Sequence, residues 1–251
     1  MSGRAAVLII AATDSSGGAG ITRDVRVLSE LGVDALCAIT AVTAQSDKTV
    51  TAVHHIPPEV IRAQIKAAFE TRRVGAIKIG MLGTRATVEA VAEALADALS
   101  GQGPPVVIDP VLVSSSGGTL LDADGRAALI RLLLPTATLV TPNIPEVAAL
   151  LGEALTTNET ALLEQGRRLL DLGSQAILLK GGHSEGEEAV DLLISRERVD
   201  RLVAPRIAGS SRGTGCALAS AIAAELASGR ALREACVAAK GYVRGMLTPR
   251  R

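Results

Sequence analysis

The chain has 251 residues, of which 48% are hydrophobic and 21% are charged, enough for one large core in a single domain covering 1–251. Its 26 basic and 26 acidic residues give a formal net charge of +0. This balance argues against a dedicated nucleic-acid or anionic-membrane binder. We therefore expect a small-molecule partner.

The cysteines and the apolar runs indicate the compartment. Cys37, Cys216 and Cys236 are widely spaced and form no CxxC pair, which favours a reducing environment. The apolar stretch at 5–12 is too short to cross a bilayer, and no later run reaches about 18 apolar residues. We expect a cytoplasmic protein with no membrane contact.

Short apolar runs alternate with longer amphipathic ones along the chain. This pattern predicts repeated strand and helix units, hence a three-layer α/β sandwich with a mostly parallel sheet and helices on both faces. The expected strands are 5–12, 34–44, 49–56, 76–79, 105–110, 138–140, 176–179, 189–195 and 199–204. The expected helices are 19–31, 59–71, 84–99, 123–134, 144–151, 160–172, 214–228 and 232–247.

Unusual residues follow directly after several of these strands. They are Asp14, Gly80 with Met81, Asp109, Asn143, and Lys180 with Gly181. Right-handed crossovers place the carboxyl ends of parallel strands at one edge of the sheet, where ligands bind. The sequence therefore predicts a ligand site at this edge.

The stretch Gly213-Thr214-Gly215-Cys216 precedes an Ala-rich helix and suggests an anion site. Its glycines let the backbone approach a ligand closely, Thr214 is expected to cap the helix, and the helix start should favour the thiolate of Cys216. Phosphoryl and acyl transfer both fit this stretch. A tight loop before a buried helix, with a core cysteine, fits it equally well.

Two common nucleotide signatures do not fit. Residues 18–23 begin like a dinucleotide fingerprint, but Arg23 stands where a small residue is required, and no GxxxxGK[ST] loop occurs.

Seven blocks together give a stronger signal. They read ATDSSGGAG at 12–20 with Asp24, TAVTAQ at 40–45, KIGM at 78–81, DPV at 109–111, TPNIPE at 141–146, KGGH at 180–183 and GTGC at 213–216. In this order they resemble the hydroxymethylpyrimidine and phosphohydroxymethylpyrimidine kinases of thiamine biosynthesis, a ribokinase-like family. The resemblance implies a ribokinase-like fold, a homodimer, and transfer of phosphate from ATP with Mg²⁺ to 4-amino-5-hydroxymethyl-2-methylpyrimidine. In most members a second transfer goes to the monophosphate.

The resemblance also implies roles for particular residues. Gly213, Thr214 and Gly215 would supply amides to the transferring phosphate, and Cys216 would act as base or as hydrogen-bond partner. Asp109 and Glu146 would hold magnesium, and Lys180, Asn143 and Gly181 would contact the nucleotide, with His183 at its border. Asp24, Gln45, Gly20 and Met81 would contact the pyrimidine.

Simpler interpretations exist for the charged residues. Glu146 is also consistent with a solvated carboxylate at a helix start. Lys180 is consistent with a lysine at the sheet edge whose side chain extends to water. Asp24 is consistent with an exposed carboxylate in a helix, between Arg23 and Arg26.

The chain departs from the family at several points. It has Ser15-Ser16 in the first block where Pro-Ser is usual, Arg212 before the glycine loop, and Ala217 after the cysteine. It also ends at Arg251 without the family's Gly-x-Gly-Pro tail. We expect transfer to both the alcohol and its monophosphate, but the missing tail leaves open whether the second transfer is kept or the substrate shifted, and Arg212 offers a charge for a phosphorylated substrate. A pyridoxal or pyridoxine kinase and a non-catalytic pyrimidine-binding protein remain as alternatives.

Overall fold

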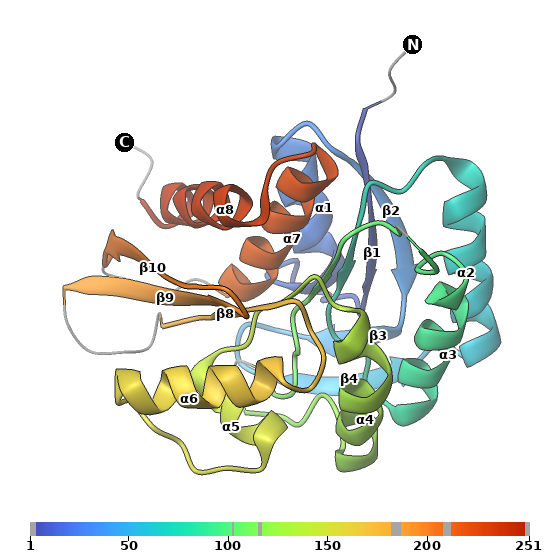
Figure 1. Cartoon of the computed structure of the whole chain (residues 1–251). Helices are drawn as coiled ribbons and strands as arrows, with labels where there is room; N and C mark the ends of the chain where they lie inside the picture. Colours follow the sequence, from blue (N-terminus) through green and yellow to red (C-terminus); the bar gives the residue numbers. More distant parts are fainter. Residues whose placement is uncertain (1–3, 102, 115–116, 182–186, 208–211, 249–251) are drawn as a thin grey trace.

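The computed structural model describes residues 4–101, 103–114, 117–181, 187–207 and 212–248. An eight-stranded sheet with the order β10-β9-β8-β7-β6-β5-β1-β2 forms its centre (Figure 1). Strands β2, β1, β5, β6, β7 and β8 run parallel, and β9 and β10 are antiparallel. The strands are β1 (Ala6–Ala11), β2 (Asp34–Ile39), β5 (Ala76–Ile79), β6 (Val106–Ile108), β7 (Leu139–Val140), β8 (Ala176–Leu179), β9 (Glu188–Ser195) and β10 (Val199–Pro205).

Helices cover both faces of this sheet, as Figure 1 shows, so the expected three-layer α/β fold is confirmed. One face carries α1 (Gly20–Glu30), α7 (Thr214–Ala227) and α8 (Leu232–Leu247), packed on Val7, Ile9 and Leu178. The other carries α2 (Pro58–Thr71), α3 (Arg85–Ala96), α4 (Ala123–Ala128), α5 (Ile144–Leu151) and α6 (Glu159–Leu170). Alternate side chains of each strand enter the two cores because successive residues point to opposite faces.

The segment 34–44 is not one strand, as the sequence suggested, but two strands in different sheets. β2 ends at Ile39, and β3 (Ala41–Gln45) pairs with β4 (Val50–His55) in a separate hairpin. Thr40 lies at the break, where its amide donates to the Ala11 carbonyl at 3.0 Å and its Oγ1 donates to the Met81 carbonyl at 2.7 Å. The first bond continues the pairing of β2 with β1, and the second joins Thr40 to the segment after β5, at the point where the chain leaves the main sheet.

Two expected helices differ in length. Thr84 caps α3 as predicted, since its Oγ1 accepts from the Thr87 amide at 3.2 Å, but the helix ends at Ala96. The expected helix 123–134 is α4 followed by a π-turn at Leu129–Leu133 and a 3₁₀ turn at Leu134–Thr136. Pro135 prevents a regular continuation because it has no amide hydrogen. No helix in the described ranges is both long and apolar enough to span a bilayer.

Candidate active site

Residues 213–215, the glycine loop, lie at the start of α7. They contact residues 12–19 between β1 and α1, which we call the first loop. Gly213 is the N-cap of α7 with φ of 75°, and a side chain there would collide with the Gly18 carbonyl. The expectation that Thr214 caps the helix is therefore wrong: Thr214 is the first helical residue, and α7 has no side-chain cap. The amides at this helix start are left available for an anion.

The carboxyl ends of the parallel strands bring the expected phosphate and metal residues to this loop. A Cβ placed on Gly215 would lie 3.2 Å from Lys180 Nζ and 3.7 Å from Asp109 Oδ2. Lys180 Nζ itself lies 2.9 Å from Asp109 Oδ1 and 3.8 Å from Glu146 Oε2. The four residues thus form one compact cluster, and Lys180 does not extend to water as the simpler interpretation held.

The pKa values of Asp109 and Lys180 are shifted in opposite directions. Burial alone would raise the pKa of Asp109, but Lys180 and Lys78 outweigh it and hold that pKa below its usual range. Burial alone would lower the pKa of Lys180, but Asp109 and Glu146 raise it. Asp109 is therefore a carboxylate and Lys180 an ammonium at neutral pH.

Glu146 is tied to the start of α5 by a capping box. Its Oε2 accepts from the Asn143 amide at 2.7 Å, while Asn143 Oδ1 accepts from the Glu146 amide at 2.8 Å. The side chain is buried, not solvated, and burial raises the pKa of Glu146 to about 7. Asn143 thus fixes the Glu146 carboxylate beside Lys180.

The thiol of Cys216 lies in the first turn of α7 and is half-buried. Burial raises the pKa of Cys216 to about 11, and the nearby Lys78 lowers it only in part. The expected thiolate is therefore corrected to a neutral thiol at pH 7. The helix start does not outweigh the cost of burying the charge.

Asp24 has a different environment from the one the sequence suggested. Its side chain is 0% exposed, and its Oδ2 lies 2.7 Å from Nζ of Lys78, which is also 0% exposed. Its Oδ1 accepts from Ser220 Oγ at 2.8 Å. The exposed-carboxylate interpretation is wrong, and this geometry points to a buried counter-ion, not to a direct pyrimidine contact.

The other expected pyrimidine contacts border the first loop. Gln45 is half-buried, and its backbone amide donates to Ser15 Oγ at 2.8 Å. Gly20 begins α1 with φ of 59°, close against the Ala12 carbonyl, and half-buried Met81 follows β5. Gln45 and Gly20 thus contact the segment 12–15 through their backbones, whereas the Met81 carbonyl accepts from Thr40 Oγ1.

Gly181 is packed too tightly for a side chain, which would collide with the Val190 carbonyl. Its amide donates to Asp191 Oδ1 at 2.9 Å, and Lys240 Nζ lies 2.6 Å from Asp191 Oδ2. Residues 182–186, including His183, lie outside the described residues.

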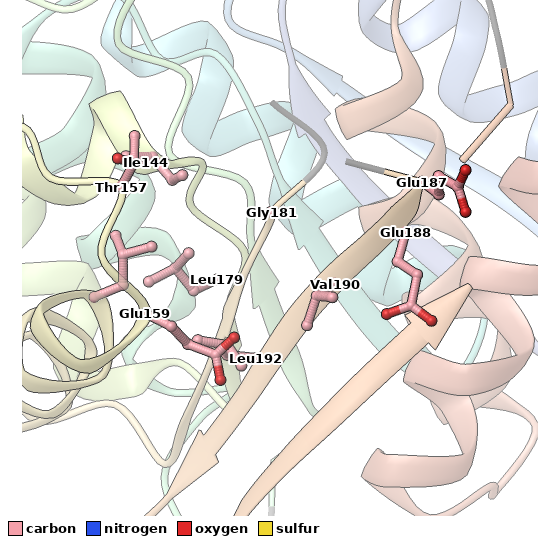
Figure 2. Close-up of a pocket in the computed structure, with 10 residues that line it drawn as sticks. Ile144, Thr157, Glu159, Leu179, Gly181, Glu187, Glu188, Val190 and Leu192 are labelled. Carbon is pink, nitrogen blue, oxygen red and sulfur yellow. The ribbon is translucent and has the colours of Figure 1, made fainter. Parts of the chain in front are cut away.

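A cavity of about 340 Å³ adjoins the cluster through Ile144 and Gly181. Figure 2 shows Leu179, Val190 and Leu192 projecting from β8 and β9 along it. Its lining also includes three carboxylates, Glu159, Glu187 and Glu188. Carboxylates repel anions, so the Gly215 and Lys180 side suits an anion better than this lining does.

Sequence reasoning missed Lys78, Ser220 and the buried Asp191. Lys78 carried a signal, because a lysine in the apolar strand 76–79 requires a buried counter-charge. Ser220 carried none, since its partner Asp24 lies 196 residues away, and neither did Asp191, whose charged partner Lys240 lies 49 residues away.

Asp109 and Glu146 suit Mg²⁺ in chemistry and number. Within the described part of the chain no group of three or more His, Cys, Asp or Glu side chains could hold a metal. Magnesium prefers hard oxygen ligands and is often bound through one or two carboxylates together with water and substrate phosphates. The pair beside Lys180 fits that pattern.

A mostly parallel sheet flanked by helices, with a glycine-capped helix start, a half-buried lysine and two carboxylates at the strand ends, defines a ribokinase-like phosphotransferase. The family model described as phosphomethylpyrimidine kinase matches residues 14–250. The chain belongs to this family.

Curated relatives and solved structures agree. The hydroxymethylpyrimidine/phosphomethylpyrimidine kinase of Rhizobium meliloti is 44% identical over 97% of this chain and 91% of its own length. The thiamine biosynthesis bifunctional protein ThiED of Geobacter sulfurreducens is 41% identical over 96% of this chain and 48% of its own length. The phosphomethylpyrimidine kinase structure from Clostridium difficile has 36% identity and a TM-score of 0.85, covering 98% of this chain and all of that one.

A second kind of kinase shares the fold. The pyridoxal kinase of Staphylococcus aureus, solved with AMP-PCP and pyridoxal, has 30% identity and a TM-score of 0.87 over 97% of this chain and 87% of that one. The fold alone therefore does not distinguish a pyrimidine from a pyridine acceptor.

Proposed function

We propose that this enzyme transfers phosphate from ATP, with Mg²⁺, to the hydroxymethyl group of 4-amino-5-hydroxymethyl-2-methylpyrimidine and then to the monophosphate, in thiamine biosynthesis. The observation that carries the proposal is the contact of Gly215 with Lys180 and Asp109. It puts amide donors, a fixed cation and a fixed carboxylate within a few ångströms of one another. Phosphoryl transfer depends mainly on such positioning and charge stabilisation.

Each part of the cluster has a distinct role. The amides of Gly213, Thr214 and Gly215 stabilise charge on the moving phosphoryl group, and donors of this kind are often worth about 3 kcal/mol each. Lys180 neutralises the nucleotide phosphates. Asn143 and Gly181 border the same nucleotide site.

The magnesium site is proposed at Asp109 and Glu146. When bound, the ion would neutralise phosphate charge and orient the nucleotide. Asn143 prepares this site by holding the Glu146 carboxylate in place through the capping box.

Cys216 acts on the acceptor hydroxyl as a neutral hydrogen-bonding thiol. A thiol with a pKa of about 11 can take up a proton only after it has become a thiolate, and burial opposes formation of the thiolate at pH 7. The amides of the glycine loop therefore stabilise the transition state of phosphoryl transfer more than the Cys216 thiol does. The second transfer needs no base, because a phosphate acceptor is already ionised near pH 7.

An assay of ADP formation with three acceptors tests this proposal: the pyrimidine alcohol, its monophosphate and pyridoxal. We expect the alcohol to give the highest kcat/KM, and Asp109→Asn to lower it at least about a hundredfold, since metal charge stabilisation is worth several kcal/mol. Lys66→Met, at an exposed pair with Glu70, is the control and should retain wild-type activity. ADP formation at the same rate with and without an acceptor would contradict the proposal.

Pyridoxal kinase is the second candidate, favoured by the similarity to structures with pyridoxal bound. It predicts that pyridoxal exceeds the pyrimidine alcohol in kcat/KM by tenfold or more. A binding protein without activity would bind the pyrimidine but form no ADP with any acceptor.

We further propose a cytoplasmic homodimer. All three cysteines are free, as a reducing compartment requires. Exposed Val42 and Val53 on the β3–β4 hairpin offer apolar surface to a second copy. Light scattering after size-exclusion chromatography would give twice the 25.6 kDa chain mass if this is correct.

A further inference from the structure

Arg212, directly before the glycine loop, lies where three segments meet. Its Nη2 lies 3.1 Å from Asp14 Oδ2 in the first loop. Its Nη1 lies 3.0 Å from Asp47 Oδ1 and donates to the Ser46 carbonyl at 2.9 Å, both at the turn of the β3–β4 hairpin. Nη1 also donates to Ser16 Oγ at 3.1 Å. One guanidinium therefore spans the first loop and the hairpin turn.

The two carboxylate contacts differ in strength. Asp14 is 2% exposed, and its Oδ1 also accepts from the amide of Ser16 at 2.9 Å, so this carboxylate shapes the first loop while it binds Arg212. Asp47 is 84% exposed, and a pair of that kind contributes little by itself. The Asp14 contact is thus the main anchor, and the Ser46 and Asp47 contacts connect the hairpin to it.

Gly213 contacts the same loop from the next position in the chain. It packs against the Gly18 carbonyl, and a Cβ on Gly18 would lie 3.5 Å from Arg212 Nη1. Arg212 and Gly213 therefore fix the glycine loop on the first loop by a side chain and by backbone packing together.

The hairpin turn follows Gln45, an expected pyrimidine contact. The amide of Gln45 donates to Ser15 Oγ, and that hydroxyl donates back to the Gln45 carbonyl, each at 2.8 Å. The Arg212 contact to Ser46 lies one residue further on. Movement of the hairpin turn would therefore move Gln45 relative to Gly213.

We propose that Arg212 is a positioning residue that holds the pyrimidine-binding hairpin and the phosphate-binding glycine loop in fixed relation through the first loop. The proposal rests on the proposed function for the identity of the acceptor. It replaces the idea that Arg212 binds a phosphorylated substrate, because Asp14 and Asp47 already face its guanidinium and would repel a phosphate.

Steady-state kinetics on three variants test the role. Arg212→Ala should lower kcat about tenfold to a hundredfold, since small misplacements of reacting groups cost that much, and should raise the KM of the pyrimidine alcohol. Arg212→Lys keeps the charge beside Asp14 but cannot span both loops, so it should restore most of kcat while KM stays raised. Asp47→Asn should raise KM about twofold and leave kcat unchanged.

Arg230→Ala is the matched control, because Arg230 pairs with Glu225 at the other end of α7. It should keep the wild-type kcat and KM. Hydrogen exchange gives a second readout that needs no acceptor: Arg212→Ala should speed amide exchange in 41–55 and 12–18, and Arg230→Ala should not.

The outcomes separate this proposal from the proposed function. If the wild-type enzyme phosphorylates no pyrimidine but Arg212→Ala still speeds exchange in the hairpin, the acceptor is wrong and the positioning role stands. If exchange in both segments and kcat/KM of Arg212→Ala equal those of the wild type, Arg212 does not position the loops. An unchanged KM for the alcohol with a raised KM for the monophosphate alone would instead make Arg212 a phosphate contact.

Discussion

Lys78 Nζ lies 2.7 Å from Asp24 Oδ2, and neither side chain is exposed to solvent. Ser220, which lies four residues after Cys216, donates a hydrogen bond from its Oγ to the second carboxylate oxygen of Asp24. Asp24 itself lies four residues after Gly20. Asp24 and Ser220 therefore each lie about one helical turn further along α1 and α7 than Gly20 and Cys216. Burial acts to lower the pKa of Lys78, but Asp24, Cys216 and Asp109 outweigh it and raise that pKa, so the lysine stays charged.

Lys78→Met is expected to lower the free energy of unfolding by about 3–5 kcal/mol, because it leaves the Asp24 carboxylate buried without its cation. The double variant Lys78→Met with Asp24→Leu removes both charges and should recover much of this loss. Urea unfolding followed by circular dichroism measures both. Lys66→Met, at an exposed pair, should change the value by no more than about 0.5 kcal/mol. A single-variant loss as small as this control would show that the buried pair contributes little.

Gly213→Ala is expected to lower kcat about a hundredfold, because a methyl group would collide with the Gly18 carbonyl and displace the amides that we propose bind the phosphate. Gly229→Ala is the matched control. Its φ of 85° is also left-handed, but nothing lies within 4 Å of the added Cβ. It should cost only about 1 kcal/mol of backbone strain and leave kcat unchanged. Equal losses of kcat in the two variants would contradict a specific role for the Gly213 contact.

Alkylation of Cys216 by iodoacetamide should be slow at pH 7 and rise about tenfold per pH unit toward pH 11, because only the thiolate reacts. The sign follows from the pKa of about 11: below it the thiol predominates, and each unit of pH multiplies the thiolate fraction by about ten. The measurement is mass spectrometry of the Cys216 peptide in a Cys37→Ser background, since Cys37 is exposed. A rate that levels off by pH 7 would show a thiolate at neutral pH.

Cys216→Ser should reduce kcat for the pyrimidine alcohol more than kcat for its monophosphate. The alcohol must lose a proton during transfer, whereas the phosphate acceptor is already ionised near pH 7. Steady-state rates with both acceptors provide the comparison, and Cys236→Ser, at a buried position within α8, serves as the control. A uniform loss with both acceptors would assign Cys216 to packing alone.

Local pattern in the sequence was sufficient for the alternation of strands and helices, the strand ends that carry Asp109 and Lys180, and the glycine loop before α7. Each depends on residues close together in the chain: apolar periodicity, glycine where a left-handed φ is needed, and polar residues just past a strand. The order of the seven blocks also indicated the family.

Only the tertiary structure decided the charge states and the long-range partners. Asp24 looked like an exposed helical carboxylate until the fold placed it against Lys78, 54 residues away, and burial kept Cys216 a neutral thiol. The pairing of Arg212 with Asp14 joins positions 198 apart. Burial and charges from distant parts of the chain set the protonation states and the partners of these residues. Neither can be predicted from the spacing of neighbouring residues, so they are determined only when the chain has folded.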